Sequence, residues 1–366
     1  MEADRDAGRT RIVDAERRRG RGAVTNASGR FEPYRRIAED DGWGSAFDLP
    51  PLPVEITREA ARKIITRNQS PDISFDRSIN PYRGCEHGCI YCFARPTHAY
   101  LGLSPGLDFE TKLTVKPNAA ALLERELSDP AYEVRVMAMG TNTDPYQPIE
   151  RTERITRSVL EVLRRTRHPV GIVTKSALVQ RDIDILAPMA EQGLAKVGVS
   201  ITTLDRGLAR TMEPRAPTPS RRLETIKRLS EAGIPTMVMV APIIPMLTDP
   251  EIERILDAAK AAGAREAGYV LLRLPNEIKD LFQEWLKEHR PDALGHVMSL
   301  VRSTRGGKAY DSAWGRRMTG DGVYAWTIGR RFEAATKRLG LNRTRSRLRT
   351  DLFVPPARPG EQLRLL

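Results

Sequence analysis

Val170-Gly171-Ile172-Val173-Thr174 and Val197-Gly198-Val199-Ser200-Ile201 decide the fold class of this 366-residue chain. Each run is short, almost continuously apolar and rich in β-branched residues, which is typical of strands buried on both faces of a parallel sheet. Three similar runs and an expected first strand complete the series: Val134–Met139, Thr236–Val240, Tyr269–Leu272 and a strand near Ile73–Ile79. The sequence therefore predicts six strands in one parallel sheet.

Amphipathic stretches separate these strands and have apolar residues at helical spacing. The three clearest sets are Ile155, Val159, Val162 and Leu163; Leu223, Ile226 and Leu229; and Ile252, Ile255 and Leu256. Gly233 and Gly263 occur where a left-handed glycine commonly ends a helix. Six such β/α units form either a doubly wound sheet or a barrel. Because no Gly-x-Gly-x-x-Gly sequence follows a strand, we predict an α/β fold with a partial (β/α)6 TIM-like barrel, and ligands at the carboxyl ends of its strands.

All three cysteines of the chain lie in the loop that follows the first predicted strand. The spacing Cys-x3-Cys-x2-Cys, with two glycines in the loop, allows the thiolates of Cys85, Cys89 and Cys92 to converge on one cubane iron–sulfur cluster. Three protein ligands leave the fourth iron open, and an open iron is a reaction site. The alternative is a structural zinc site that adds His87 or His98, although His87 lies inside the loop and His98 lies six residues beyond it.

Cys-x3-Cys-x-aromatic-Cys after the first strand of a six-unit β/α chain resembles the radical S-adenosylmethionine superfamily, over roughly residues 73–275. The resemblance implies a [4Fe-4S] cluster and S-adenosyl-L-methionine as cofactors, with the open iron chelating the methionine amino and carboxylate groups. It also implies that Tyr91, the aromatic residue before the last cysteine, packs near the adenine. An electron from an external donor of the flavodoxin or ferredoxin type then cleaves the C5′–S bond, and the resulting 5′-deoxyadenosyl radical abstracts hydrogen from a substrate.

Polar residues at the ends of later strands extend this resemblance to the spore photoproduct lyase-like branch of the superfamily. Thr143 and Asp144 follow the second strand, Lys175 follows the third and Ser200 lies at the end of the fourth. The matching positions imply that these four residues contact the cofactor. By residue chemistry, an acid suits an ammonium group and a lysine suits a carboxylate. An ordinary turn before proline at Asp144 and an ordinary strand end at Lys175 are the alternatives.

The chain departs from that branch at the hydrogen donor. Spore photoproduct lyases have a further cysteine near the second-strand motif that returns a hydrogen atom to the substrate, and this sequence has none there. The catalytic hydrogen donor is therefore unassigned, with four tyrosines as candidates: Tyr82, Tyr91, Tyr146 and Tyr310. Two loops are candidates for covering the site. Glu213-Pro214-Arg215 places Arg215 over it or begins a helix, and residues 314–318 close the open side of the barrel or form a solvated turn.

Charge divides the chain into three parts. The 59 Lys+Arg and 47 Asp+Glu residues give a net charge of +12, and the segment 337–366, with 8 basic and 2 acidic residues, carries +6 of it. Residues 1–48 are rich in arginine and poor in aliphatic residues, so we predict a flexible arm there. Residues 49–275 form the predicted radical S-adenosylmethionine core, and residues 276–366 form a helical and basic extension.

The basic extension bears on the substrate. Arg343, Arg345, Arg347 and Arg349 alternate with uncharged residues, so an extended strand would present four guanidinium groups to the phosphates of a nucleic acid. A solvated tail is the alternative, and nucleic acid is the favoured substrate. Two other hypotheses stay open: the same machinery acting on a protein or metabolite, and a non-catalytic nucleic-acid-binding protein with structural zinc. With no secretory signal and no apolar run of about 20 residues, we expect a cytoplasmic protein without a membrane partner.

Overall fold

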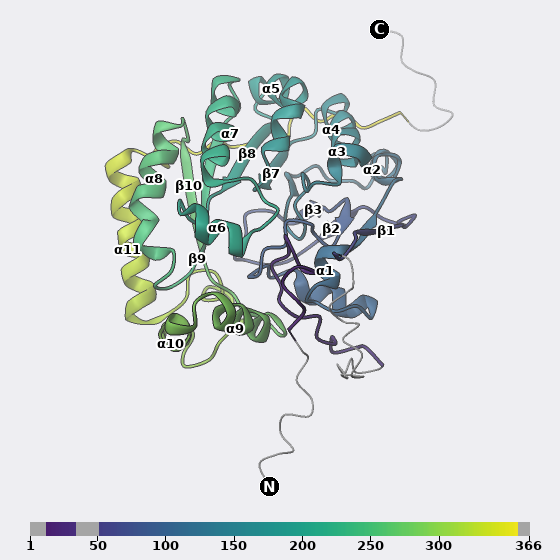
Figure 1. Ribbon diagram of the computed structural model, residues 1–366. Coiled ribbons are helices and arrows are strands. Elements are labelled where there is room, and N and C mark those ends of the chain that lie inside the picture. Colours follow the sequence, from purple (N-terminus) through teal and green to yellow (C-terminus); the bar gives the residue numbers. More distant parts are fainter. Residues whose placement is uncertain (1–11, 34–50, 358–366) are drawn as a thin grey trace.

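The computed structural model describes residues 12–33 and 51–357, and its centre is a seven-stranded sheet (Figure 1). Six strands run parallel in the order β10-β9-β8-β7-β6-β3, and β2 pairs antiparallel with β3 at one edge. The bounds are β2 Ile65–Arg67, β3 Arg77–Ile79, β6 Met137–Met139, β7 Val170–Thr174, β8 Ala195–Ser200, β9 Thr236–Ile243 and β10 Glu266–Leu271. The sheet does not close, so the predicted partial (β/α)6 barrel is confirmed.

Helices lie between consecutive strands and cover the outer face of the sheet (Figure 1). The helices up to β10 are α1 Asp108–Thr111, α2 Ala119–Leu127, α3 Glu150–Glu153, α4 Ile155–Arg165, α5 Ile183–Glu191, α6 Arg206–Met212, α7 Pro219–Glu231 and α8 Ile252–Ala261. After β10 come α9 Ile278–His289, α10 Leu294–Ser303 and α11 Gly322–Leu339. A second, three-stranded sheet contains β1 Glu55–Arg58, β5 Lys112–Val115 and β4 Tyr82–Arg83. Its strand β4 leads directly into the cysteine loop.

The apolar residues that predicted the fold form its core. Val170 and Ile172 of β7 are buried, and so are Val159 and Leu163 of α4, which lie in the same cluster. Burying an aliphatic side chain contributes about 1.5–3 kcal/mol, so these faces hold the helices on the sheet. Several strand boundaries differ from the prediction. Strands β3 and β6 begin later, at Arg77 and Met137, β8 and β10 begin earlier, at Ala195 and Glu266, and β9 continues to Ile243. Val134 to Val136 remain outside the sheet because that stretch is half-buried or exposed and unpaired.

A segment after β10 bridges the open side of the barrel. The amide of Leu271 in β10 donates a hydrogen bond of 2.9 Å to the carbonyl of Met318. Three residues earlier, the amide of Gly315 donates to Asp72, and Arg317 forms an ion pair with the same carboxylate. Asp72 lies in the loop between β2 and β3 at the other edge of the sheet. Residues 314–318 therefore span the gap between the last and first strands, as one of the two interpretations predicted.

The prediction of a flexible arm over residues 1–48 is wrong for residues 12–33, which lie against the barrel. Ala23 and Val24 are completely buried, and the amides of Gly22 and Ala23 donate to the buried carboxylate of Glu110. The backbone of Gly22 approaches the Gly88 carbonyl so closely that a Cβ there would lie 1.9 Å from its oxygen. Hydrogen bonds to distant parts of the chain therefore hold this segment in place, although it has few aliphatic side chains to bury. The rest of the predicted arm, residues 1–11 and 34–48, lies outside the described residues.

The arginine-rich segment 343–349 lies at the amino ends of the strands. The backbone amides of Asn342, Arg349 and Val354 donate to the carbonyls of Arg265, Gly193 and Thr166, which lie one to four residues before the next strand begins. The cysteine loop lies at the opposite, carboxyl ends. The four arginines therefore lie at the opposite end of the barrel from the cysteine loop, and their role in binding nucleic acid stays a prediction.

The helices in the described part of the chain are all too short or too polar to cross a bilayer.

Candidate active site

The cysteine loop begins one residue after β4 and turns tightly. Cys85 and Cys89 are buried and Cys92 is half-buried. The amide of Gly88 donates to the carbonyl of Cys85, and the amide of Cys92 donates to that of Cys89. Gly88 has φ +66°, and a Cβ at this position would lie 2.6 Å from the Glu110 carboxylate. Two successive turns thus bring the three cysteines together on one loop.

A buried arginine holds the loop from behind. The Arg95 guanidinium is completely buried, and it donates to the carbonyls of Gly88 and Cys89 at 3.0 and 2.9 Å. It also donates to two carbonyls at residues 105 and 106 and forms a 2.5 Å ion pair with Glu110. These hydrogen bonds hold the carbonyl oxygens of the cysteine loop against Arg95, and they therefore fix the backbone of the loop.

Gln147 binds the backbone on both sides of Cys85. Its side-chain oxygen accepts a hydrogen bond from the amide of Glu86 at 2.9 Å, and its nitrogen donates to the carbonyl of Gly84 at 3.1 Å. Gln147 is completely buried in the loop that follows β6. The second β/α unit therefore fixes the position of the first cysteine.

Asp144 ties three parts of the site together. One carboxylate oxygen accepts bonds from the hydroxyl of Thr174 and the amide of Tyr146, and the other accepts the amide of Lys175 at 2.8 Å and lies 3.3 Å from Nδ1 of His87. Burial raises the pKa of Asp144, but the charge and hydrogen bond of His87 and the two other donors lower it to about 2. Both oxygens are therefore used by the protein itself.

Tyr91 is buried, and its hydroxyl is anchored in a polar network. It donates to Glu213 and lies 3.1 Å from the hydroxyl of Thr202, which also donates to Glu213. Glu213 forms an ion pair with Arg222, and both side chains are 1% exposed. The Arg222 guanidinium in turn donates to the carbonyl of Ser200 at the end of β8. The ring of Tyr91 therefore has a fixed orientation at the carboxyl ends of the strands.

The other predicted contact residues lie around the same place. The ammonium of Lys175 lies 5.6 Å from the centroid of the Tyr91 ring, and no carboxylate of the described residues is within ion-pair distance of it. The hydroxyl of Thr143 donates to the carbonyl of Tyr82 at 3.2 Å. Ser200 is buried at the end of β8. The structure thus brings together the cysteine loop and the ends of β6, β7 and β8, and the charge of Lys175 acts on the Cys89 thiol.

The loop 213–215 contacts the cysteine loop. Arg215 forms a 2.9 Å ion pair with Glu86, and its amide bonds the carbonyl of His87. The amide of Ile90 donates to the carbonyl of Met212. Of the two interpretations of this loop, the structure supports the one that places Arg215 over the site.

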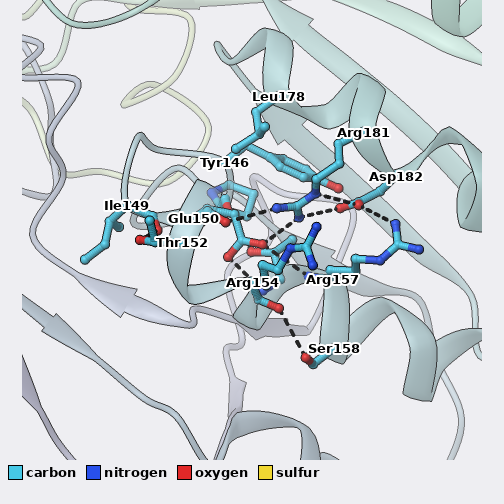
Figure 2. Close-up of polar contacts among 12 residues, drawn as sticks. Tyr146, Ile149, Glu150, Thr152, Arg154, Arg157, Ser158, Leu178, Arg181 and Asp182 are labelled. Atoms are coloured by element: carbon cyan, nitrogen blue, oxygen red, sulfur yellow. Dashed lines mark hydrogen bonds and ion pairs between the residues drawn. The ribbon is translucent and has the colours of Figure 1, made fainter.

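A second polar network joins Glu150, Arg181 and Asp182 (Figure 2). Glu150 is completely buried and accepts hydrogen bonds from the hydroxyl of Tyr82 and from Arg181, and Arg181 also pairs with Asp182. The Arg181 guanidinium lies 6.0 Å from the centroid of the Tyr146 ring. Among the candidate hydrogen donors, the hydroxyls of Tyr82 and Tyr91 are thus engaged by buried carboxylates, and Tyr146 is completely buried.

The three cysteines fit an iron–sulfur cluster. Burial raises the pKa of the Cys85 thiol, and the nearby charges of Asp144, Cys89 and Cys92 raise it further. Burial also raises the pKa of Cys89, with the Lys175 ammonium opposing it. Thiolates in this loop therefore need the positive charge of a bound metal. The three thiols lie on one loop that Arg95 and Gln147 hold in place, and they would supply the three cysteine ligands of a [4Fe-4S] cluster.

The histidines of the zinc alternative are engaged elsewhere. His87 faces Asp144, and Nε2 of His98 is 2.9 Å from the carbonyl of Lys112. Within the described ranges, no three His, Cys, Asp or Glu side chains surround a point as ligands of a single ion would. These contacts argue against the zinc interpretation.

A partial α/β barrel with a three-cysteine loop at the carboxyl ends of its strands defines a class of metal-dependent enzyme domain. Residues 79–259 match the family model of the radical SAM superfamily, and the chain belongs to this superfamily. Its members use a [4Fe-4S] cluster and S-adenosylmethionine, so the chain carries an enzyme domain.

The chain is also similar to two uncharacterized proteins and, in its fold, to a solved structure. An uncharacterized protein of Mycobacterium tuberculosis strain H37Rv is 39% identical over 232 residues, which cover 63% of this chain and 68% of that protein. An uncharacterized protein of Methanocaldococcus jannaschii is 30% identical over 199 residues, 54% of this chain and 71% of that one. Spore photoproduct lyase complexed with a dinucleoside spore photoproduct has a similar fold, with a TM-score of 0.53, 17% identity and 78% of each chain covered.

Sequence reasoning missed the residues that orient the loop, above all Arg95, Gln147 and Glu213. Arg95 and Gln147 act through the backbone of the loop, and such bonds leave no pattern in a sequence. The one available signal was position, because Gln147 belongs to the small polar cluster after β6 and Arg95 lies three residues after Cys92.

Proposed function

We propose that this chain is a radical S-adenosylmethionine enzyme of the spore photoproduct lyase-like branch. The observation that carries the proposal is the cysteine loop, fixed by Arg95 and Gln147. Beside it lies the ammonium of Lys175, which has no ion-pair partner among the described residues. When bound, a [4Fe-4S] cluster and S-adenosyl-L-methionine supply a one-electron cleavage chemistry that abstracts hydrogen from a substrate. Cys85, Cys89 and Cys92 would hold the cluster.

The remaining residues divide into two roles. Lys175 offers a cation for the methionine carboxylate, and Tyr91 offers a flat, oriented ring for the adenine. Asp144 was predicted to receive the amino group, but its oxygens are taken by His87 and neighbouring donors. We therefore assign Asp144 as a positioning residue for the loop. Thr143, whose hydroxyl bonds a carbonyl, and Ser200 remain predicted contacts.

Tyr310 is the tyrosine best placed to take part in hydrogen transfer. It is half-buried, and its hydroxyl lies 3.4 Å from the Arg273 guanidinium beyond β10. Unlike Tyr82 and Tyr91, its hydroxyl is not hydrogen-bonded to a buried carboxylate among the described residues. An external electron donor of the flavodoxin or ferredoxin type is part of the proposal. Nucleic acid is the proposed substrate, since a protein of this fold was solved with a dinucleoside photoproduct.

Anaerobic reconstitution tests this function. Protein supplied with iron and sulfide should retain about four irons per chain. With a reductant and S-adenosylmethionine it should release 5′-deoxyadenosine, detected by mass spectrometry. Cys85→Ala, Cys89→Ala and Cys92→Ala should each abolish both results. Stoichiometric zinc without iron in anaerobically purified protein would instead support the non-catalytic alternative. If only a peptide or a metabolite stimulates cofactor cleavage, that compound class replaces nucleic acid as the proposed substrate.

A further inference from the structure

Arg305 is a buried guanidinium without a carboxylate partner. It is 2% exposed and lies under the carboxyl end of β10, where it donates to the carbonyls of Leu271 and Leu272 at 3.4 and 2.8 Å and to that of Arg316 at 2.7 Å. Its Nε has no hydrogen-bond partner. No carboxylate of the described residues lies within 4.0 Å of the guanidinium. Buried cations are normally paired, because an unpaired one costs several kcal/mol.

Arg273 is a second guanidinium at the carboxyl end of β10. It follows β10 by two residues and lies 5.0 Å from the centroid of the Phe93 ring. Phe93 comes directly after Cys92, so Arg273 adjoins the cysteine loop. Its polar contacts are long, 3.4 Å to the hydroxyl of Tyr310 and 3.5 Å to the sulfur of Met318, and its Nε is buried without a partner. Burial first, and then the charge of Arg273, lower the pKa of Arg305, so the two cations act on each other.

The acids nearby are already engaged. Asp72 acts on Arg273 from a distance, but its oxygens accept bonds from Arg317 and the amide of Gly315. Asp311 acts on Arg305, but it pairs with Arg316 at 3.5 Å and accepts the amide of Ala313. Among the described residues, Arg273 and Arg305 therefore have no carboxylate in ion-pair contact at the carboxyl end of β10, on the side of the sheet that carries the cysteines.

We infer that Arg273 and Arg305 form an anion subsite for a phosphate group of a single-stranded nucleic acid substrate. The inference rests on the proposed function and names a contact for its substrate. Guanidinium groups suit phosphate oxygens because their donors form a fork. The exposed aromatic neighbours favour a nucleic acid over a peptide. Phe93, whose ring lies beside Arg273, is 44% exposed, and Trp314, four residues before the Met318 that contacts Arg273, is 63% exposed. Exposed aromatic rings beside a positively charged groove are what the bases of single strands stack on.

The assignment differs from the phosphate-tracking tail that the sequence suggested. Arg343 to Arg349 lie at the amino ends of the strands, whereas Arg273 contacts Phe93 beside the last cysteine. A phosphate at Arg273 would keep the adjoining nucleotide next to the cysteine loop and to Tyr310. Arg273 touches the substrate directly, and Arg305, which lies beneath it, adds charge and fixes the end of β10.

Fluorescence anisotropy of a labelled oligothymidylate decamer on the anaerobic, reconstituted protein tests the subsite. Arg273→Gln should weaken binding about tenfold and flatten the log–log salt dependence by about 0.7, the value for one phosphate contact on a single strand. Arg302→Gln is the matched control, because Arg302 is exposed on α10 and carries the same charge. It should change neither quantity. Arg273→Lys should restore the salt dependence and only part of the affinity.

Three outcomes would overturn the subsite. The wild type does not bind the decamer at low salt; Arg273→Gln and Arg302→Gln lose equal affinity for the decamer; or Arg273→Gln loses affinity for an oligoglutamate peptide and keeps its affinity for the decamer. A decamer with a neutral methylphosphonate backbone should bind wild type and Arg273→Gln alike. The proposed function fails separately, if wild-type protein releases no 5′-deoxyadenosine. Circular dichroism and thermal midpoints of each variant check that the fold is retained.

Discussion

The ammonium of Lys175 lies 5.6 Å from the centroid of the Tyr91 ring. The two residues come from different β/α units, the third and the first, and meet at the carboxyl ends of the strands beside Cys89. Lys175 is positioned by its own amide, which donates to Asp144, and Tyr91 by its hydroxyl, which donates to Glu213. A cation and an aromatic ring are thereby fixed next to one cysteine loop before any ligand binds.

Lys175→Ala should weaken the binding of S-adenosylmethionine while the iron content stays unchanged. A hydrogen bond to a charged group contributes about 1.5–3 kcal/mol, which corresponds to about a 10- to 100-fold loss of affinity. Isothermal titration of reconstituted protein measures it. Lys196→Ala is the control, since Lys196 lies near the amino end of β8 and faces Glu266 at 3.9 Å. Equal affinities in wild type and Lys175→Ala would show that this ammonium does not contact the cofactor.

Glu213→Gln should destabilise the protein strongly. The substitution leaves the Arg222 guanidinium, which is 1% exposed, without its negative partner and weakens the anchor of Tyr91. Breaking a buried ion pair on one side typically costs about 3–5 kcal/mol. Urea unfolding monitored by circular dichroism measures the change. Glu224→Gln removes the exposed partner of Arg228 and should leave the midpoint unchanged, so similar shifts in both variants would refute a special role for Glu213.

Gln147→Ala should reduce the iron retained after reconstitution and gel filtration. The variant loses two hydrogen bonds to the backbone around Cys85, worth about 1–3 kcal/mol together. Gln147→Glu keeps the acceptor for the Glu86 amide and should lose less iron. Gln192→Ala, at an exposed position, is the control. Iron content equal to wild type in Gln147→Ala would mean that the loop holds its shape without this clamp.

The features that could be predicted are those determined by residues close together in the sequence. Buried strands have continuous apolar runs, so the six parallel strands were predictable, although β3 and β6 are shorter than expected. The cysteine spacing identified the loop. Lys175 was recognisable because a lysine directly after a buried strand must emerge at its carboxyl end.

Contacts between distant parts of the chain could not be predicted. Residues 22 and 23 are held by Glu110, some 88 residues further along, and no local pattern predicts that pairing. The same holds for the course of segment 343–349 along the amino ends of the strands, since its alternating arginines describe an extended segment without saying where it docks. The contacts of Asp144 with His87 and Thr174 also join different β/α units, so the sequence alone does not predict them.

His168 should make the stability of the protein depend on pH. Burial lowers its pKa to about 4, against about 6.5 in an unfolded chain. Nε2 of His168 is 2.7 Å from the hydroxyl of Tyr132, and its Nδ1 is 3.0 Å from the carbonyl of Pro169, so the ring is held neutral in the fold. Between these two pKa values the unfolded chain binds a proton that the folded chain does not.

The contribution of the neutral His168 ring to the free energy of unfolding is therefore complete above pH 6.5 and is lost as the pH falls toward 4. At pH 5 the loss should reach about 2 kcal/mol relative to pH 7.5. Urea unfolding at both values should show this difference in wild type, and His168→Gln should reduce it by about that amount. His296→Gln, which replaces an exposed histidine on α10, should keep the wild-type dependence. A pH dependence that is the same in wild type and His168→Gln would show that the ring takes up a proton without unfolding.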